Sequence, residues 1–298
     1  MGIKHMLMME TEDVFNYFIG EARALKRKLF TDNINYLFIK GTQRICLVAH
    51  IDTVGGEWQA GKRVAVKKRL HERHGIITAF KEGTKTRTVL GADDRAGCYG
   101  LMEIMKIDER PSILLTNFEE CGGIGARIFT EQTELWKNFD FMVELDRQGC
   151  NEYVQYNNNP HEVHAFLAKF GIKNGGHGSY SDIATISRAT KIPSVNMAIG
   201  YTGQHGDHEY LDIAAMNLAI TKTKLIVHRY CQDKPEFGSI KEKVYEPVKR
   251  VYYFDKKDFN NEDIEKCAEC GQTNGYHYRS CPDYVEPVDD FRQPALLM

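Results

Sequence analysis

The sequence predicts a three-layer α/β sandwich in which helices cover both faces of a mostly parallel central sheet. Between residues 34 and 230, short apolar runs of β-forming residues alternate with segments of helical periodicity, as expected for parallel strands joined by crossover helices. Apolar residues make up 42% of the 298 residues, which is enough for a sizeable core. After Cys231 the composition shifts to charged, aromatic and proline residues. This shift predicts a domain at residues 1–232 and a small tail at residues 233–298.

Composition argues against several classes of protein. The 39 basic and 41 acidic residues give a net charge of -2, without the basic excess typical of nucleic-acid-binding proteins. The first ten residues lack the apolar stretch of a signal peptide, and no later run approaches the ~20 apolar residues of a membrane span. Most of the eight cysteines are scattered singly, as buried free thiols usually are. We therefore expect a soluble, cytoplasmic protein that binds neither nucleic acid nor membranes.

The first half of the chain predicts helices and strands in alternation. Residues 11–25 open with a helix N-cap signature and carry apolar side chains at helical spacing. Runs of β-forming residues at 36–39 and 45–48 flank Gly41, which predicts neighbouring strands with a tight connection. Residues 55–75 predict a surface segment with a short strand at 64–66. A strand at 76–80 and a helix from Asp94 to 107 follow.

The second half continues this alternation. The predicted strands are 112–116, 139–145 and 193–199, and the predicted helices are 124–129, 161–170, 183–188 and 211–230. The run at 139–145 is apolar almost throughout, which is typical of a strand buried on both faces. The glycine-rich segment 173–182 predicts a flexible loop.

Side chains that can bind metals directly follow several predicted strands. They are His50 and Asp52, Asp93 and Asp94 at the start of a helix, Glu119 and Glu120, and Asp146. Because the carboxyl ends of parallel strands meet at one edge of a sheet, these side chains should gather there. Carboxylates packed so densely would raise one another's pKa unless a cation held them ionised. The sequence therefore predicts a site for one or two divalent metal ions.

Five motifs, in this order, carry a resemblance to a known family. They are His-x-Asp-Thr-Val at 50–54, Gly-Ala-Asp-Asp-Arg-Ala-Gly at 91–97, Glu-Glu-x-Gly-Gly-x-Gly-Ala at 119–126, an acid at 146 and His-x-x-x-Glu at 205–209. Together they resemble the co-catalytic di-zinc exopeptidases, which include peptidase T, related carboxypeptidases and deacylases, and bacterial zinc aminopeptidases. The resemblance covers residues 40–215. It implies two zinc ions, or other divalent metals, and hydrolysis of a peptide or amide bond.

The resemblance also implies a role for each motif residue. His50 and Asp146 bind one metal, Asp93 bridges both, Glu120 binds the second, and the last ligand is either His205 or His208. Asp52 fixes the tautomer of His50. Glu119 takes a proton from the attacking water and returns it to the leaving amine. The family also holds the Asp93–Asp94 peptide bond cis.

The spacing of the motifs bears on the substrate. Many relatives insert a lid domain between the third acid and the final histidine, whereas 58 residues separate Asp146 from His205 here, too few for a lid besides the core elements. The resemblance therefore implies a lidless aminopeptidase, with carboxylates left over near the site to hold the ammonium group of the substrate. An N-acyl amino acid deacylase is the alternative, and a non-catalytic metal-binding scaffold is less favoured. His177, in the glycine-rich loop, is a candidate substrate-binding residue. The sequence indicates no oligomeric state.

The tail contains a separate metal-binding motif. Cys267, Cys270, His277 and Cys281 have the spacing C-x2-C-x6-H-x3-C, which suits a closed tetrahedral site for one structural zinc ion. The segment resembles a zinc knuckle with a longer interval before the histidine. A tail of this size has little core, so the metal would supply most of its folding free energy. The alternative is three unrelated thiols and an exposed histidine.

Overall fold

The computed structural model describes residues 1–55, 57–59, 62–64 and 67–240. The zinc ligands predicted in the tail, Cys267, Cys270, His277 and Cys281, lie outside these residues, so the tail site stays a prediction. The chain divides into units at Met1–Glu242 and Lys243–Met298, and only the first is described here. Within it, Phe237 packs against the core and Ile240 is buried. No helix in the described part of the chain is long and apolar enough to cross a membrane.

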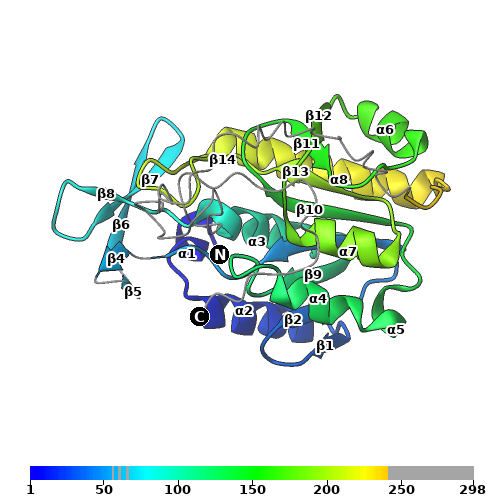
Figure 1. Ribbon diagram of the computed structural model, residues 1–298, viewed down its shortest axis with the longest axis horizontal. Helices are drawn as coiled ribbons and strands as arrows, with labels where there is room; N and C mark the ends of the chain where they lie inside the picture. The colour runs from blue at the N-terminus through cyan, green and yellow to red at the C-terminus, as the bar shows by residue number, and fades with distance from the viewer. Residues whose placement is uncertain (56, 60–61, 65–66, 241–298) are drawn as a thin grey trace, which may run out of the picture. The chain divides into compact units, whose positions relative to one another are not determined.

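An eight-stranded sheet forms the centre of the first unit (Figure 1). Its strands lie in the order β1 (Leu29–Thr31), β2 (Tyr36–Ile39), β9 (Ser112–Thr116), β3 (Ile45–His50), β10 (Phe141–Arg147), β13 (Ser194–Ala198), β11 (Glu152–Gln155) and β12 (Lys173–His177). The four central strands, from β9 to β13, are parallel. Both neighbours of β2 are antiparallel to it, and β11 is antiparallel to β13. The predicted α/β fold with a mostly parallel sheet is confirmed.

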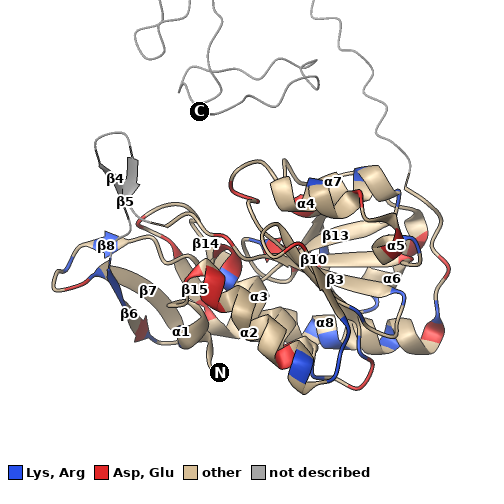
Figure 2. Cartoon of the chain, turned by 90° about the horizontal axis from the view of Figure 1, so that it is seen from below, with Lys and Arg blue, Asp and Glu red and all other residues tan. Residues whose placement is uncertain are grey.

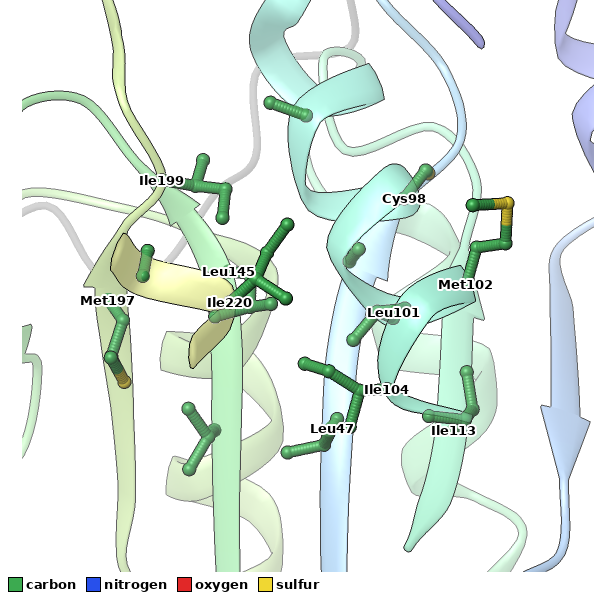
Figure 3. Close-up of a cluster of buried hydrophobic side chains, with 14 of the residues drawn as sticks. Leu47, Cys98, Leu101, Met102, Ile104, Ile113, Leu145, Met197, Ile199 and Ile220 are labelled. Atoms are coloured by element: carbon green, nitrogen blue, oxygen red, sulfur yellow. The ribbon is translucent and has the colours of Figure 1, made fainter. Parts of the chain in front are cut away.

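Helices pack on both faces of this sheet (Figure 2). One face carries α1 (Ile3–Met6), α2 (Thr11–Ala24), α3 (Ala92–Ile104), α6 (His161–Ala168) and α8 (Ile213–Asp233), and the other carries α4 (Ile124–Thr130), α5 (Thr133–Trp136) and α7 (Asp182–Thr190). Leu101 and Ile104 of α3 lie against Leu47 and Ile113 of the sheet (Figure 3). Each such side chain contributes about 1.5–3 kcal/mol when it leaves water. This burial fixes the helix that begins at the predicted metal ligands.

β2 and β3 are not neighbours, so the pairing predicted from the connection at Gly41 is wrong. β9 lies between them, antiparallel to β2 and parallel to β3. The connection passes close to the start of β9, where a Cβ added to Gly41 would lie 2.2 Å from the carbonyl oxygen of Arg110. A connection of this length spans two strand spacings easily, since an extended residue covers about 3.3–3.6 Å and strands lie about 4.8 Å apart. A short loop therefore does not determine which strand becomes the partner.

A second sheet, which is antiparallel, was not predicted. It contains β6 (Lys68–Arg73), β7 (Ile76–Lys81), β8 (Arg87–Thr88), β14 (Tyr201–Thr202) and β15 (Tyr210–Asp212). The β6–β7 hairpin turns at His74 and Gly75, with φ of 53° and 79°, as two-residue hairpin turns require. β6 is mostly exposed, so its sequence lacks the apolar alternation that identifies a strand. The strand predicted at 64–66 overlaps β5 (Lys62–Val64), which pairs with β4 (Glu57–Gln59), while residues 65 and 66 lie outside the described residues.

Residues 146–205, all of them described, contain β11, α6, β12, α7, β13 and β14. No separate domain is inserted in this interval, as the count of residues predicted. The segment 173–177 forms the edge strand β12, paired with β11, where the sequence predicted a loop. Glycines lower the β propensity of this segment, but pairing with a neighbouring strand decides its conformation.

Candidate metal centre

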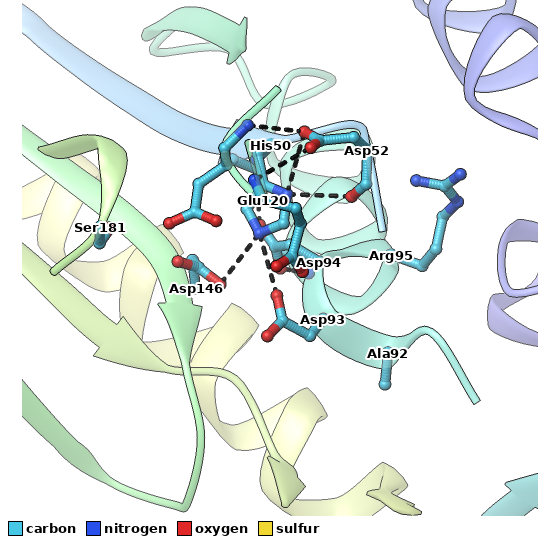
Figure 4. A network of polar contacts seen from close by, with 12 residues as sticks. His50, Asp52, Ala92, Asp93, Asp94, Arg95, Glu120, Asp146 and Ser181 are labelled. Atoms are coloured by element: carbon cyan, nitrogen blue, oxygen red, sulfur yellow. Dashed lines mark hydrogen bonds and ion pairs between the residues drawn. The ribbon is translucent and has the colours of Figure 1, made fainter. Parts of the chain in front are cut away.

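Five of the predicted metal ligands converge at the carboxyl ends of the central strands. Figure 4 shows four of them, His50, Asp93, Glu120 and Asp146. His50 ends β3, Asp146 lies near the end of β10, Asp93 lies at the start of α3, Glu120 follows β9, and His205 lies between β14 and β15. The side chain of His50 is only 1% exposed and that of Asp146 8%. His205 is 46% exposed and closes the site on the solvent side.

The carboxylate of Asp93 lies between two sets of donor atoms. Its Oδ1 is 2.9 Å from His50 Nε2, which in turn lies 3.4 Å from Asp146 Oδ1. Its Oδ2 is 3.2 Å from His205 Nε2, which lies 2.9 Å from Glu120 Oε1. One carboxylate therefore faces two half-sites, each with one imidazole and one further acid.

These donor atoms suit divalent cations. Atoms of His50, Asp93 and Glu120 that can bind a metal all lie within 4.8 Å of one another. Glu120 Oε1 is buried and lies 2.9 Å from the imidazole Nε2 of His205, and a buried carboxylate is costly unless a positive charge compensates it, which a bound cation can supply. Imidazole nitrogens with carboxylate oxygens form the donor set that zinc accepts.

The protonation of the two imidazoles leads to the same conclusion. Hydrogen bonds to Asp93 and Glu120 raise the pKa of His205 to about 10. Burial alone would lower the pKa of His50, but Asp146 and the other acids outweigh it and raise the pKa well above the usual value. Without metal, both imidazoles are therefore positively charged at neutral pH. Their charge lies where a bound cation would compensate the carboxylates.

Asp52 connects the two halves of the site through four contacts. Its backbone carbonyl oxygen lies 2.9 Å from His50 Nδ1, and its carboxylate lies 3.5 Å from the same nitrogen. The carboxylate oxygens also accept hydrogen bonds from the backbone N–H groups of Glu119 and Glu120, each at 3.1 Å. The first contact is made by the backbone carbonyl and leaves His50 Nε2 facing Asp93, whereas the sequence predicted that the carboxylate of Asp52 fixes the tautomer. The link to Glu119 and Glu120 could not be read from the sequence, because it joins two backbone segments.

Glu209 holds the loop that carries Asp93, a role that the sequence did not reveal. Its carboxylate is completely buried and accepts hydrogen bonds from the backbone N–H groups of Leu90, Gly91, Ala92 and Asp93, at 2.7–3.3 Å. Glu209 stands just before β15 and therefore connects the second sheet to the metal centre. The His-x-x-x-Glu spacing was a signal for this residue, but it did not indicate the partner.

Asp94 supports the same loop from the other side. Atoms of Asp94, His50 and Asp146 that could bind a metal lie within 4.8 Å of one another. The carboxylate of Asp94, however, already accepts hydrogen bonds from the backbone N–H groups of His50, at 3.2 Å, and Gly97, at 2.8 Å. Asp94 therefore anchors the backbone at the start of α3. The Asp93–Asp94 peptide bond is cis, as the resemblance implied.

Glu119 and the metal-centre residues line a cavity of about 360 Å³. Burial, reinforced by the nearby carboxylates of Asp146 and Asp182, raises the pKa of Glu119 to about 9. Its carboxyl group can thus hold a proton at the edge of the cavity. A cation bound nearby would lower this pKa, and the carboxylate could then accept a proton at neutral pH and release it again.

Two further buried acids lie near the site without lining the cavity. Glu144 accepts hydrogen bonds from the Ser181 hydroxyl and, at 3.2 Å, from Ile183 N–H, so it holds the start of α7. Burial raises the pKa of Asp182 to about 7. The acids that line the cavity are therefore Asp93, Glu119, Glu120 and Asp146. All four are residues that the sequence predicted as metal ligands or as the base.

The two remaining histidine candidates lie away from this centre. The side chain of His208 is 75% exposed, and its nearest acid is Asp207 at 3.7 Å. His177 is exposed on β12, and its ring lies 3.3 Å from Asn158 Oδ1. The residues that line the cavity on the side of β12 are instead Ser179 and Tyr180.

Comparisons with known proteins address the fold. A scan of protein-family profiles finds no match, and a search of curated proteins finds no similar sequence. Solved structures do share this α/β architecture. One is aminopeptidase PepT from Bacillus cereus, with 15% sequence identity and a TM-score of 0.59; the match covers 77% of this chain and 97% of that chain. Another is a tripeptidase from Staphylococcus aureus, with 14% identity and a TM-score of 0.60; the match covers 77% of this chain and 97% of that chain. A third is an aminopeptidase from the archaeon Desulfurococcus kamchatkensis, with 15% identity and a TM-score of 0.55; the match covers 76% of this chain and 93% of that chain. At these identities the similarity establishes the fold.

Proposed function

We propose that the protein is a zinc-dependent hydrolase that cleaves peptide bonds as an aminopeptidase, with a two-metal centre. The arrangement around Asp93, with one imidazole and one acid on each side, is the observation that carries this proposal. Three proteins that share the fold are described as aminopeptidases or a tripeptidase, which supports a peptide as the substrate. The buried free thiols of Cys46 and Cys98 suit the expected cytoplasmic setting.

Each residue of the centre has a proposed task. His50, Asp146 and Asp93 Oδ1 would hold one ion, and His205, Glu120 and Asp93 Oδ2 would hold the other. Two bound ions supply Lewis acidity, which favours deprotonation of water and stabilises charge on the carbonyl oxygen. Glu119 accepts the proton of the attacking water and returns it to the leaving amine. Asp52 keeps His50 and the backbone of Glu119 and Glu120 in place.

The glutamate at 119 provides the sharpest test of this assignment. Glu119→Gln should keep the metal content of the wild type but lower kcat by a factor of about 10²–10⁴, because it removes the proton acceptor and spares the ligands. Metal content is measured by atomic emission and activity by single-turnover and steady-state hydrolysis. Glu134→Gln changes an acid that is 79% exposed and serves as the control. Wild-type turnover in Glu119→Gln would refute the role of the base.

A panel of substrates distinguishes the proposed aminopeptidase from the alternatives. Amino-acid p-nitroanilides and short peptides should be cleaved, whereas N-acetyl amino acids should not. The deacylase would show the opposite preference with the same ligands, because the two activities differ only in the residues around the metals. A metal-loaded protein that cleaves none of these substrates would favour the scaffold.

A further inference from the structure

The cavity beside the metal centre contains one guanidinium group among the described residues. Arg147 lines this cavity, and it follows Asp146 directly at the end of β10. The other charged residues that line the cavity are His205 and the four acids already assigned to the metals or to the base. The part of the cavity outside the metal centre therefore carries a positive charge.

The guanidinium of Arg147 is available to a ligand. Its Nε is buried and has no hydrogen-bond partner among the described residues, and Glu152 Oε1 lies 3.8 Å from Nε, beyond hydrogen-bonding distance. The side chain is 34% exposed, so it reaches solvent without being fully hydrated. An arginine whose buried N–H lacks an acceptor is poised to bind a carboxylate, which can accept two parallel hydrogen bonds from one guanidinium.

The neutral groups around Arg147 complete a polar subsite. Gln148, Ser179, Tyr180 and Gln204 also line the cavity and carry amide or hydroxyl groups. They can donate hydrogen bonds to peptide oxygens. The volume of about 360 Å³ lies at the small end of the usual range for ligand sites, which suits a short substrate. Its carboxylate then lies within a residue or two of the bond that is cleaved, at about 3.3–3.6 Å per residue.

We propose that Arg147 binds the C-terminal carboxylate of a short peptide, so that the enzyme acts on dipeptides and tripeptides with a free C-terminus. This inference rests on the proposed peptide hydrolysis and adds the end of the substrate that is recognised. It replaces the expected capture of an ammonium group by spare carboxylates, since no unassigned acid among the described residues lines the cavity.

The test compares a tripeptide such as Ala-Ala-Ala with its C-terminal amide on the zinc-loaded, full-length protein. For the wild type, kcat/KM should be about 10- to 100-fold higher for the free acid, because the amide cannot form a charged pair with arginine. Arg147→Gln should lose this preference through a higher KM for the acid, with little change for the amide. Arg147→Lys should retain part of it. Arg229→Gln, an exposed arginine near the end of α8, should behave as the wild type.

Each other outcome has a separate meaning. Equal rates for acid and amide in the wild type would overturn the role of Arg147 and leave peptide hydrolysis standing. Discrimination that survives in Arg147→Gln would also overturn it. A further comparison uses two C-terminally amidated peptides, one with a glutamate side chain and one with glutamine. If the wild type prefers the glutamate peptide by the same factor as it prefers the free acid over the amide, Arg147 binds a side-chain carboxylate and the C-terminal assignment is refuted. Failure to hydrolyse any peptide would overturn the proposed function itself.

Discussion

At Asp93, one carboxylate serves both halves of the proposed centre. Asp93→Asn replaces one of its two oxygens with an amide nitrogen, which cannot bind a metal. We expect both ions to be lost together, with an affinity at least about 10-fold lower, whereas Glu120→Gln should weaken one ion preferentially. Metal content after dialysis against a graded series of chelator concentrations measures both effects. Asp207→Asn, at a residue that is 76% exposed, is the control, and undiminished occupancy in Asp93→Asn would rule out bridging.

At the scale of single residues, the sequence predicted those that share a motif and missed those that act through backbone groups. His50, Asp93, Glu120 and Asp146 could be named as candidates because each belongs to a motif at or near the end of a predicted strand or at the start of a helix, whereas the motif left the last candidate open between His205 and His208. Glu209 could not be assigned its partners, since the four N–H groups that it contacts lie about 117 residues earlier in the chain. Arg147 carried no signal either, because a charged residue after a strand is more often a solvated one.

At the scale of elements, local pattern predicted the parallel strands and most helices, because a strand or helix buried on one or both faces leaves a period in the sequence. The pairing of strands was less accessible. β9 lies between β2 and β3, an order that depends on contacts across the whole sheet and leaves no local pattern in the sequence. β7 was predicted as a strand at 76–80, but its partner β6 and the edge strand β12 were missed, since exposed strands carry no apolar alternation.

The place where the chain passes β9 gives a test of this pairing. Gly41→Ala brings a Cβ to 2.2–2.5 Å from backbone atoms of Arg110, Pro111 and Ser112, which cannot move without disturbing β9. We expect a loss of about 1–3 kcal/mol in the free energy of unfolding. Gly20→Ala is the matched control, because its Cβ meets nothing within 4 Å on helix α2 and should stabilise the protein by up to about 1 kcal/mol. Urea denaturation measures both, and a neutral Gly41→Ala would contradict the described crossing.

At the scale of the whole molecule, the protons held by the metal-free centre predict how stability depends on pH. The pKa of His205 is raised to about 10 and that of Glu119 to about 9, so the folded state binds more protons than the unfolded state, in which a histidine titrates near pH ~6.5. These two groups should therefore stabilise the metal-free protein most below the unfolded pKa of Glu119, about 4.5, and their contribution should be lost as the pH rises through about 9 for Glu119 and about 10 for His205.

Metal binding must displace these protons, so the affinity for zinc should rise over the same range of pH. Thermal denaturation with and without chelator from pH 6 to 10, together with calorimetry in buffers of different ionisation enthalpy, measures both trends. His205→Asn should flatten the slope of the metal-free protein, whereas His208→Asn should keep it. Stability of the metal-free protein that rises with pH would contradict the protonation described here.

The tail adds one prediction about the composition of the whole chain. If the tail binds zinc through its three cysteines and His277, the protein should contain about three zinc ions, two of them catalytic. The double variant Cys267→Ser with Cys270→Ser should then contain about one fewer and keep its peptidase activity. The exposed Cys150→Ser is the control. Equal zinc content in the double variant and the wild type would show that these thiols bind no metal.

The hydrogen bonds from the loop at 90–93 to Glu209 affect local unfolding of the second sheet. Any fluctuation that withdraws this carboxylate from the loop at 90–93 releases β15 from that loop and also frees Asp93 to move. We therefore expect local unfolding of the second sheet and loss of the proposed metal ions to occur as one cooperative event. Ions that bind only the form in which Glu209 holds the loop add RT ln(1 + [M]/Kd) to its stability. Metal should therefore also slow hydrogen exchange at the amides of β7, which bind no metal but pair with β15.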